Sequence, residues 1–137
     1  LRLNGDVRGL VRSSQIATGE ENDLRIAIYG TKGGFRWEQE NPNFLIYLKE
    51  GEPYQVLKPG HPYNGEFAQE STKMAPGHPE GIFDSMGNIY KGAAKSIRKQ
   101  EIKDGVYPTI RDGVRGMQFI EAAVESSKNG NTWTDLA

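Results

Sequence analysis

The sequence predicts an α+β fold: a largely antiparallel sheet, a meander, with two long helices packed on one face and the other face available for oligomerisation. Two observations carry this prediction. Short apolar runs separated by Gly, Pro and Asn fill the first half of the 137 residues, whereas two long segments of helical periodicity fill the second half. Strands followed by helices are typical of α+β domains, not of alternating α/β folds.

Five strands are expected in the first half, at residues 6–17, 24–29, 35–39, 44–49 and 54–57. Between the second and third, Thr31-Lys32-Gly33-Gly34 is expected to supply the positive φ angles of a tight hairpin turn. Asn41-Pro42-Asn43 and residues 51–53 mark the next two breaks. Such short connections favour antiparallel neighbours.

Two of these strands carry apolar residues on both faces. Residues 24–29 place Leu24, Ile26 and Ile28 on one side and Ala27 and Tyr29 on the other, and residues 44–48 repeat the pattern. A sheet with one wet face alternates more cleanly. We therefore expect a partner subunit or a missing domain to cover the second face.

The second half begins with a Gly- and Pro-rich loop at residues 58–76, long enough to be functional or mobile. A helix is expected over residues 79–99, with Pro79 in its first turn and Glu80 at its positive end. A second helix begins near Ile110, where Thr109 and Asp112 form a variant capping box, and ends at Asn129-Gly130. Residues 131–136 are expected to form a short final strand.

Composition indicates one folded, soluble domain with a real core. The 17 basic and 18 acidic residues are interspersed and nearly cancel, which argues against nucleic-acid and membrane-surface partners. The absence of cysteine is compatible with a cytoplasmic protein, and no apolar run or signal-peptide core suggests a membrane. Because the chain starts at Leu1 within a strand-like region, we expect a piece of a longer polypeptide; processing of the protein is the alternative.

The glycine run at residues 30–34 has two interpretations. A phosphate-binding loop requires Gly-x-x-x-x-Gly-Lys-Ser/Thr spacing before a helix, and this run has neither. A hairpin turn is favoured instead. No Gly-x-Gly-x-x-Gly occurs in the chain, so no dinucleotide-binding residue is assigned.

Two histidines are the candidates for site chemistry. Neither His61 nor His78 has the spacing of a metal site, and no metal is expected. His78 and Glu80 lie at the end of the long loop beside a helix start, where they could hydrogen-bond the hydroxyls of a sugar. The alternative is that His78 only caps the helix or is solvated.

Aromatic residues also have two interpretations. Tyr29, Trp37, Tyr47 and Tyr54 lie on neighbouring strands and could form a stacking platform for a sugar ring, or could be core and interface side chains. Tyr90 lies in the apolar stripe of its helix, so its ring is expected in the core, and its hydroxyl must find a polar partner.

Three stretches of the chain resemble the C-terminal domain of the Gfo/Idh/MocA oxidoreductases. They lie in the family's order and cover most of the chain: LRIAIYGTKGGFRWEQENPN at residues 24–43, GHPEGIFDSMGNIY at residues 77–90, and YPTIRDGVRGMQFIEAAVESS at residues 107–127. The last of these is typical of the family's closing helix.

The resemblance implies a two-part enzyme. An N-terminal Rossmann domain would bind NAD or NADP, and this C-terminal domain would shape the pocket for a sugar, inositol or similar polyol and form the homo-oligomer interface. In such an architecture the hydroxyl of Tyr90 could contact substrate. The family's Glu-Lys-Pro motif and its proton-transfer histidine have no match here, so no catalytic residue is assigned and the chain alone should be inactive. The alternative is a non-catalytic binding or assembly module that reuses the fold.

Overall fold

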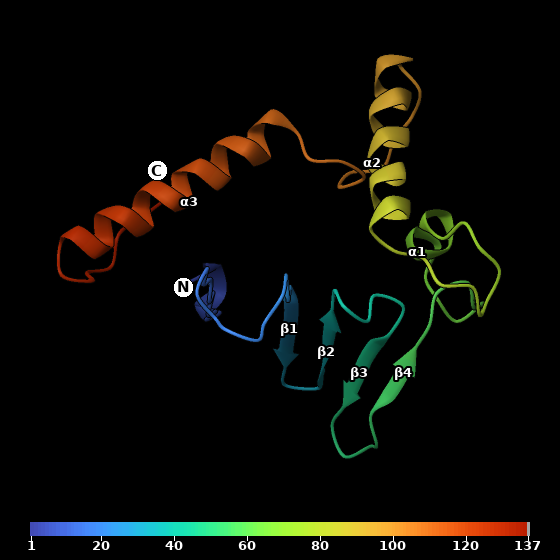
Figure 1. The fold of residues 1–137 in the computed structure, drawn as a ribbon, viewed down its shortest axis with the longest axis horizontal. Coiled ribbons are helices and arrows are strands. Elements are labelled where there is room, and N and C mark those ends of the chain that lie inside the picture. Colours follow the sequence, from blue (N-terminus) through green and yellow to red (C-terminus); the bar gives the residue numbers. More distant parts are fainter. Residues whose placement is uncertain (137) are drawn as a thin grey trace. The chain divides into compact units, whose positions relative to one another are not determined.

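The computed structural model describes residues 1–136. The chain divides into two compact units, Leu1–Lys58 and Pro59–Ala137. The first unit contains a 3-10 turn, η1 (Asn4–Asp6), and a four-stranded sheet. The second contains three helices, α1 (Glu66–Ser71), α2 (Ile82–Ile97) and α3 (Ile110–Lys128). The segregation of strands from helices confirms the α+β prediction (Figure 1).

The sheet is an antiparallel meander in the order β1-β2-β3-β4 (Figure 1). Its strands are β1 (Arg25–Gly30), β2 (Gly33–Glu38), β3 (Leu45–Lys49) and β4 (Gln55–Leu57). Each pairs with its neighbour in sequence, so every connection is short. The first and last residues of all four strands lie within two residues of the predicted ones.

The two glycines at the start of β2 have a different role from the one expected. The β1–β2 turn contains only Thr31 and Lys32, and no residue from 31 to 34 has a positive φ angle. A Cβ atom on Gly33 would lie 2.3 Å from the carbonyl oxygen of Leu48, and one on Gly34 would lie 2.4 Å from that of Ile28. Close approach of the neighbouring strands requires glycine there, not a left-handed turn.

Strand register assigns the side chains to two faces, because paired residues share a face and successive residues alternate. One face, here the aromatic face, carries Ile26, Ile28, Phe35, Trp37, Leu45, Tyr47, Leu57 and the polar residues Lys49 and Gln55. The opposite face, here the mixed face, carries Arg25, Ala27, Tyr29, Arg36, Glu38, Ile46, Leu48 and Val56. Both are rich in apolar groups, as predicted.

Two predicted strands are wrong. Residues 6–17 form no strand; the turn η1, an isolated bridge between Arg2 and Arg8 and a few backbone hydrogen bonds order only the first nine residues. Their alternating pattern is compatible with a strand, but no neighbouring strand pairs with it. Residues 131–136 also form no strand, because the chain folds back on the end of α3: Ser126 Oγ donates to the carbonyl of Thr132 (2.7 Å), and the Asn131 N–H donates to that of Ser126 (2.7 Å).

Helix α3 begins and ends as predicted. The Asp112 carboxylate accepts hydrogen bonds from the backbone N–H and the hydroxyl of Thr109, both at 2.7 Å. The hydroxyl first, and then the backbone N–H, hold the pKa of Asp112 below its ordinary value. At the other end Asn129 is the C-cap and Gly130 has φ of 76°.

Helix α2 begins later than predicted. Its N-cap is Gly81, whose N–H donates to Asp84 Oδ2 at 2.9 Å, so Pro79 and Glu80 precede the helix instead of forming its first turn. Within the helix, Gly92 is buried, and a Cβ atom there would lie 2.6 Å from Val106 Cγ1. The segment after α2 therefore packs directly on its backbone.

The expected core is absent from both units. No hydrophobic side chain among residues 1–136 is buried; Phe83 on α2 is 89% exposed and Ile110 on α3 is 90% exposed. None of the helices in this range combines the length and apolarity needed to cross a bilayer. Periodic apolar stripes of this kind imply a covering surface that neither unit supplies by itself.

Candidate functional site

His78 lies in the loop between α1 and α2, in a segment of residues 73–80 that we call the His78 loop. Its side chain is exposed, and its backbone N–H donates to the carbonyl of Ala75 at 3.2 Å. The Nδ1 atom lies 3.1 Å from the same carbonyl oxygen. Because a carbonyl can only accept, the neutral imidazole that makes this bond carries its proton on Nδ1 and leaves Nε2 as an acceptor.

Glu80 closes the His78 loop. Its Oε1 atom accepts the backbone N–H groups of Lys73 and Met74, both at 2.7 Å. One carboxylate oxygen thus joins the last residue of the loop to the first two. Glu80 stands beside His78 in the sequence, as expected, and its described contacts support the loop.

Lys73 attaches the loop to α2. Its ammonium group donates to the carbonyl oxygen of Asp84 and to Asn88 Oδ1, both at 2.8 Å, and Asn88 Nδ2 donates in turn to the carbonyl of Ser71 at 2.8 Å. Sequence reasoning missed Lys73 and Asn88. The signal that could have found them is the spacing of residues 84 and 88, which places both on one side of the helix facing the loop.

A second lysine attaches α1 to the segment between α2 and α3. Lys103 Nζ lies 2.9 Å from Glu70 Oε1 and 3.3 Å from Glu66 Oε1. The hydrogen bond to Lys103 lowers the pKa of Glu70, and the bond to Glu70 raises that of Lys103. These groups are exposed, so the pair orients α1 more than it stabilises the fold.

Tyr90 is separated from the loop. It follows Asn88 by two residues on α2, which places it on roughly the opposite side of that helix. Its side chain is 68% exposed, so the expectation of a core ring is wrong for this unit, and its hydroxyl makes no hydrogen bond within residues 1–136. The structure therefore brings His78 and Glu80 together and leaves Tyr90 apart.

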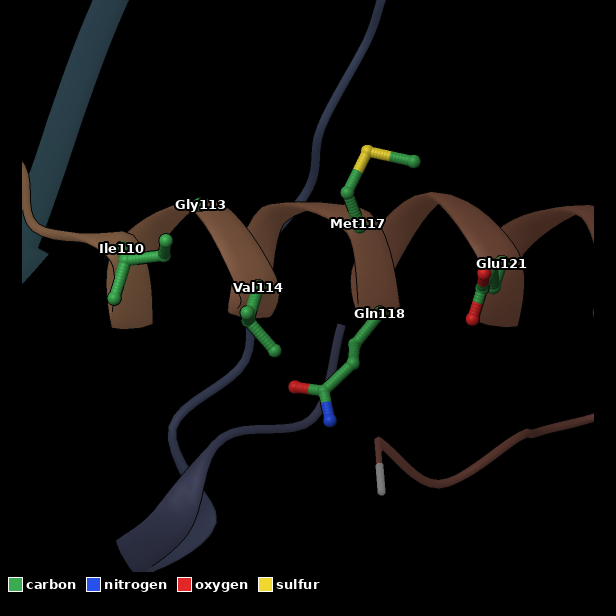
Figure 2. A pocket seen from close by; sticks show the side chains of 6 residues that line it. All are labelled: Ile110, Gly113, Val114, Met117, Gln118 and Glu121. Atoms are coloured by element: carbon green, nitrogen blue, oxygen red, sulfur yellow. The ribbon is translucent and has the colours of Figure 1, made fainter.

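A shallow groove runs along α3 (Figure 2). All of its lining residues belong to this one helix: Ile110, Gly113, Val114, Met117, Gln118 and Glu121. It has no opposing wall, and Glu121 is its single ionisable group. The groove is therefore an uncovered apolar stripe and not an enclosed ligand pocket.

The aromatic residues of the sheet do not form one platform. Tyr29 lies on the mixed face, whereas Trp37 and Tyr47 lie on the aromatic face, where Tyr47 stacks on Phe35 with ring centroids 5.2 Å apart. Trp37 Nε1 donates to the carbonyl of Pro42 at 3.0 Å. The predicted stacking platform is therefore split between the two faces of the sheet. The hairpin interpretation of residues 30–34 is confirmed, since the turn joins two strands.

The sequence matches the family described as "Oxidoreductase family, C-terminal alpha/beta domain" over residues 1–136. It is 36% identical over 139 aligned residues to the uncharacterized oxidoreductase YfiI of Bacillus subtilis (strain 168). That alignment covers 97% of this chain and 35% of YfiI. The chain thus spans about a third of the length of this relative.

Solved structures agree. An oxidoreductase from Sinorhizobium meliloti is 41% identical with a TM-score of 0.83, over 89% of this chain and 35% of that one. An inositol dehydrogenase homolog from Azotobacter vinelandii, complexed with NAD+, is 32% identical with a TM-score of 0.87, over 96% of this chain and 36% of that one. The chain belongs to the Gfo/Idh/MocA oxidoreductase family and corresponds to its C-terminal domain.

Proposed function

We propose that this chain is the substrate-binding and assembly portion of an NAD(P)-dependent dehydrogenase that oxidises a polyol such as inositol or a sugar. The observation that carries the proposal is the similarity over 96% of the chain to the Azotobacter vinelandii inositol dehydrogenase homolog complexed with NAD+. An inositol dehydrogenase homolog from Azotobacter vinelandii complexed with NADH and myo-inositol is 28% identical, with a TM-score of 0.72. Both support a polyol substrate and a nicotinamide cofactor.

In this proposal the dinucleotide belongs to a Rossmann domain elsewhere in the full-length polypeptide. The dinucleotide supplies hydride chemistry, and the residues of this chain bind and orient the substrate. His78 offers Nε2 to a substrate hydroxyl and Glu80 supports the loop, whereas Tyr90, on the other side of α2, is not assigned to this contact. This division of labour makes the chain inactive by itself.

The direct test is activity of the full-length protein. Purified enzyme is assayed with NAD and with NADP against myo-inositol and a panel of sugars and polyols, following nicotinamide absorbance. We expect oxidation of at least one polyol with one of the two cofactors. Absence of both dinucleotide binding and turnover would favour the alternative, a non-catalytic binding or assembly module.

A matched experiment uses this chain alone. Calorimetric titration with NAD(H) and NADP(H) should give no heat, because the chain has no Gly-x-Gly-x-x-Gly loop before a helix to hold a pyrophosphate. Sub-millimolar affinity for either dinucleotide would contradict the proposed division between the two parts.

We also propose that the mixed face of the sheet contacts a second copy of the chain. Arg25, Tyr29 and Arg36 belong to residue types enriched in interfaces, and Arg36 and Glu38 lie two residues apart on β2. In a two-fold arrangement, Arg36 of each copy can pair with Glu38 of the other copy, as a self-complementary surface requires. A stable contact would bury about 800 Å² on each copy.

Adjacent substitutions on β3 test this assignment, since Ile46 lies on the mixed face and Tyr47 on the aromatic face. In the full-length protein, Ile46→Asp should yield folded subunits of lower oligomeric order by light scattering. Tyr47→Asp should unfold the domain, because in this proposal the rest of the full-length subunit covers the aromatic face, where Tyr47 stacks on Phe35. A monomeric wild-type protein, or identical behaviour of the two variants, would contradict the proposal.

A further inference from the structure

We propose that the His78 loop is a preformed binding site for a substrate hydroxyl. His78 Nε2 accepts a hydrogen bond from that hydroxyl, and Lys73 and Glu80 act as positioning residues. The inference rests on the proposed function and deepens it. It assigns a direction to the hydrogen bond and names the residues that hold the imidazole in place.

The direction follows from the contact between His78 and Ala75. Nδ1 lies 3.1 Å from the Ala75 carbonyl oxygen, so Nδ1 donates and the neutral ring has its lone pair on Nε2. A lone pair accepts from a hydroxyl, and neutral Nε2 has no hydrogen to offer a ketone. The loop therefore binds the hydroxyl form of a substrate group in preference to its carbonyl or ether form.

The loop is held at both ends before any ligand arrives. Glu80 Oε1 accepts the N–H groups of Lys73 and Met74, which closes residues 73–80 into a loop. The Lys73 ammonium then donates to the carbonyl oxygen of Asp84 and to Asn88 Oδ1 on α2. A regular helix thus supports the loop through a side chain, which lowers the entropic cost of ordering His78 on binding.

The first experiment measures the loop without substrate, in the full-length protein. Nitrogen-15 spectra of labelled histidine, assigned by comparison with His78→Ala, should show the Nδ1–H tautomer for His78. Amide exchange should show the Lys73 and Met74 N–H groups exchanging about fivefold faster or more in Glu80→Ala, the factor expected for one lost hydrogen bond. Glu80→Gln keeps a carbonyl acceptor and should exchange like the wild type.

The second experiment measures recognition, with myo-inositol and its monodeoxy analogues as probes. Lys73→Met and Glu80→Ala should raise KM about fivefold or more while kcat changes less than about twofold, the pattern of lost ground-state positioning. Lys91→Met, which removes a lysine charge from α2 without touching the loop, should leave both constants unchanged. The wild type should bind one deoxy analogue, the one that lacks the hydroxyl contacted by His78, more weakly than myo-inositol. His78→Ala should bind that analogue as tightly as the wild type does.

Each outcome decides something. An Nε2–H tautomer for His78, or exchange unaffected by Glu80→Ala, would overturn the loop geometry whether or not the protein is a dehydrogenase. A correct tautomer and protected amides in a protein that oxidises no polyol would count against the proposed function alone. If wild type and His78→Ala lose the same affinity for every deoxy analogue relative to myo-inositol, His78 does not bind a substrate hydroxyl.

Discussion

The contacts inside the sheet unit differ in kind from the contacts inside the helical unit. In the sheet, each strand pairs through its backbone with the next one along the chain, as β1 does with β2 across a two-residue turn. In the helical unit, lysine side chains bridge residues far apart in sequence: Lys73 reaches Asn88, and Lys103 reaches Glu70. Local pairing fixes the scaffold, and longer-range polar links fix the loop that carries His78.

The two units share one property. Neither buries a hydrophobic side chain within residues 1–136. Backbone ladders and exposed ion pairs contribute modestly to net stability compared with apolar burial. In the full-length protein, we therefore expect the apolar stripes of both units to be covered.

The largest effect should come from breaking the sheet where the backbones of β1 and β2 approach each other closely at Gly34. Gly34→Ala would place Cβ 2.4 Å from the carbonyl oxygen of Ile28, a backbone atom that cannot move without separating β1 from β2. We expect the full-length protein to lose about 3 kcal/mol of unfolding free energy in denaturant titrations.

Gly30→Ala is the matched control in the same hairpin. Its Cβ would meet the nearest atom, the Gly33 carbonyl oxygen, at 3.5 Å, an ordinary contact. Its stability should stay within about 0.5 kcal/mol of the wild type. Equal effects of the two substitutions would show that close approach is not what requires glycine at position 34.

Sheet and helix periods predicted much of the fold, and tertiary context explains the errors. The apolar runs that form β1 and β3, and the Thr109–Asp112 cap of α3, are local sequence signals that the structure confirms. Residues 6–17 show that a strand-like pattern needs a partner to become a strand. Helix α1 was missed because EFAQES has too few apolar residues to show a helical stripe.

The site was predictable in part. The position of His78 at the end of a long loop came from Gly and Pro signals, but the start of α2 was placed too early, so Glu80 was assigned to the helix terminus. In the structure its carboxylate turns back to the N–H groups of Lys73 and Met74. The spacing of residues 84 and 88 places both on one side of α2, but it does not identify the loop residue that contacts them, which is why Lys73 was missed.

A smaller effect should distinguish two glycines of α2. Gly92→Ala would bring Cβ to 2.6 Å from Val106 Cγ1, whereas at Gly87 the nearest atom is Lys73 Cε at 3.8 Å. Gly87→Ala should stabilise the protein by about 1 kcal/mol through helix propensity. Gly92→Ala should destabilise it by about 1 to 2 kcal/mol, because overpacking outweighs the same gain.

Thermal unfolding of the two variants measures this difference in sign. If both substitutions stabilise the protein, the contact between α2 and the segment carrying Val106 is not maintained in solution.

The smallest effect concerns the α3 cap. The Thr109 hydroxyl and N–H lower the pKa of Asp112 below 3.8, so its stabilising contribution is present above that pH and is lost as pH falls through the lowered pKa. Thr109→Val removes the hydroxyl and should raise the pKa of Asp112 toward 3.8, whereas Thr109→Ser should preserve the shift. Carboxyl NMR titration would measure both; an unchanged pKa in Thr109→Val would contradict the cap geometry.

The central claim, that the helical unit presents His78 to substrate, is tested most directly by the kinetics of His78→Ala in the full-length enzyme. The account predicts a KM for the polyol raised several-fold to tens-fold, about the worth of one hydrogen bond, with a smaller fall in kcat. His61→Ala is the control, since His61 stacks on Tyr63 outside the loop, with ring centroids 5.0 Å apart. Unchanged kinetics for His78→Ala, or a thousand-fold loss of kcat at constant KM, would contradict the positioning role.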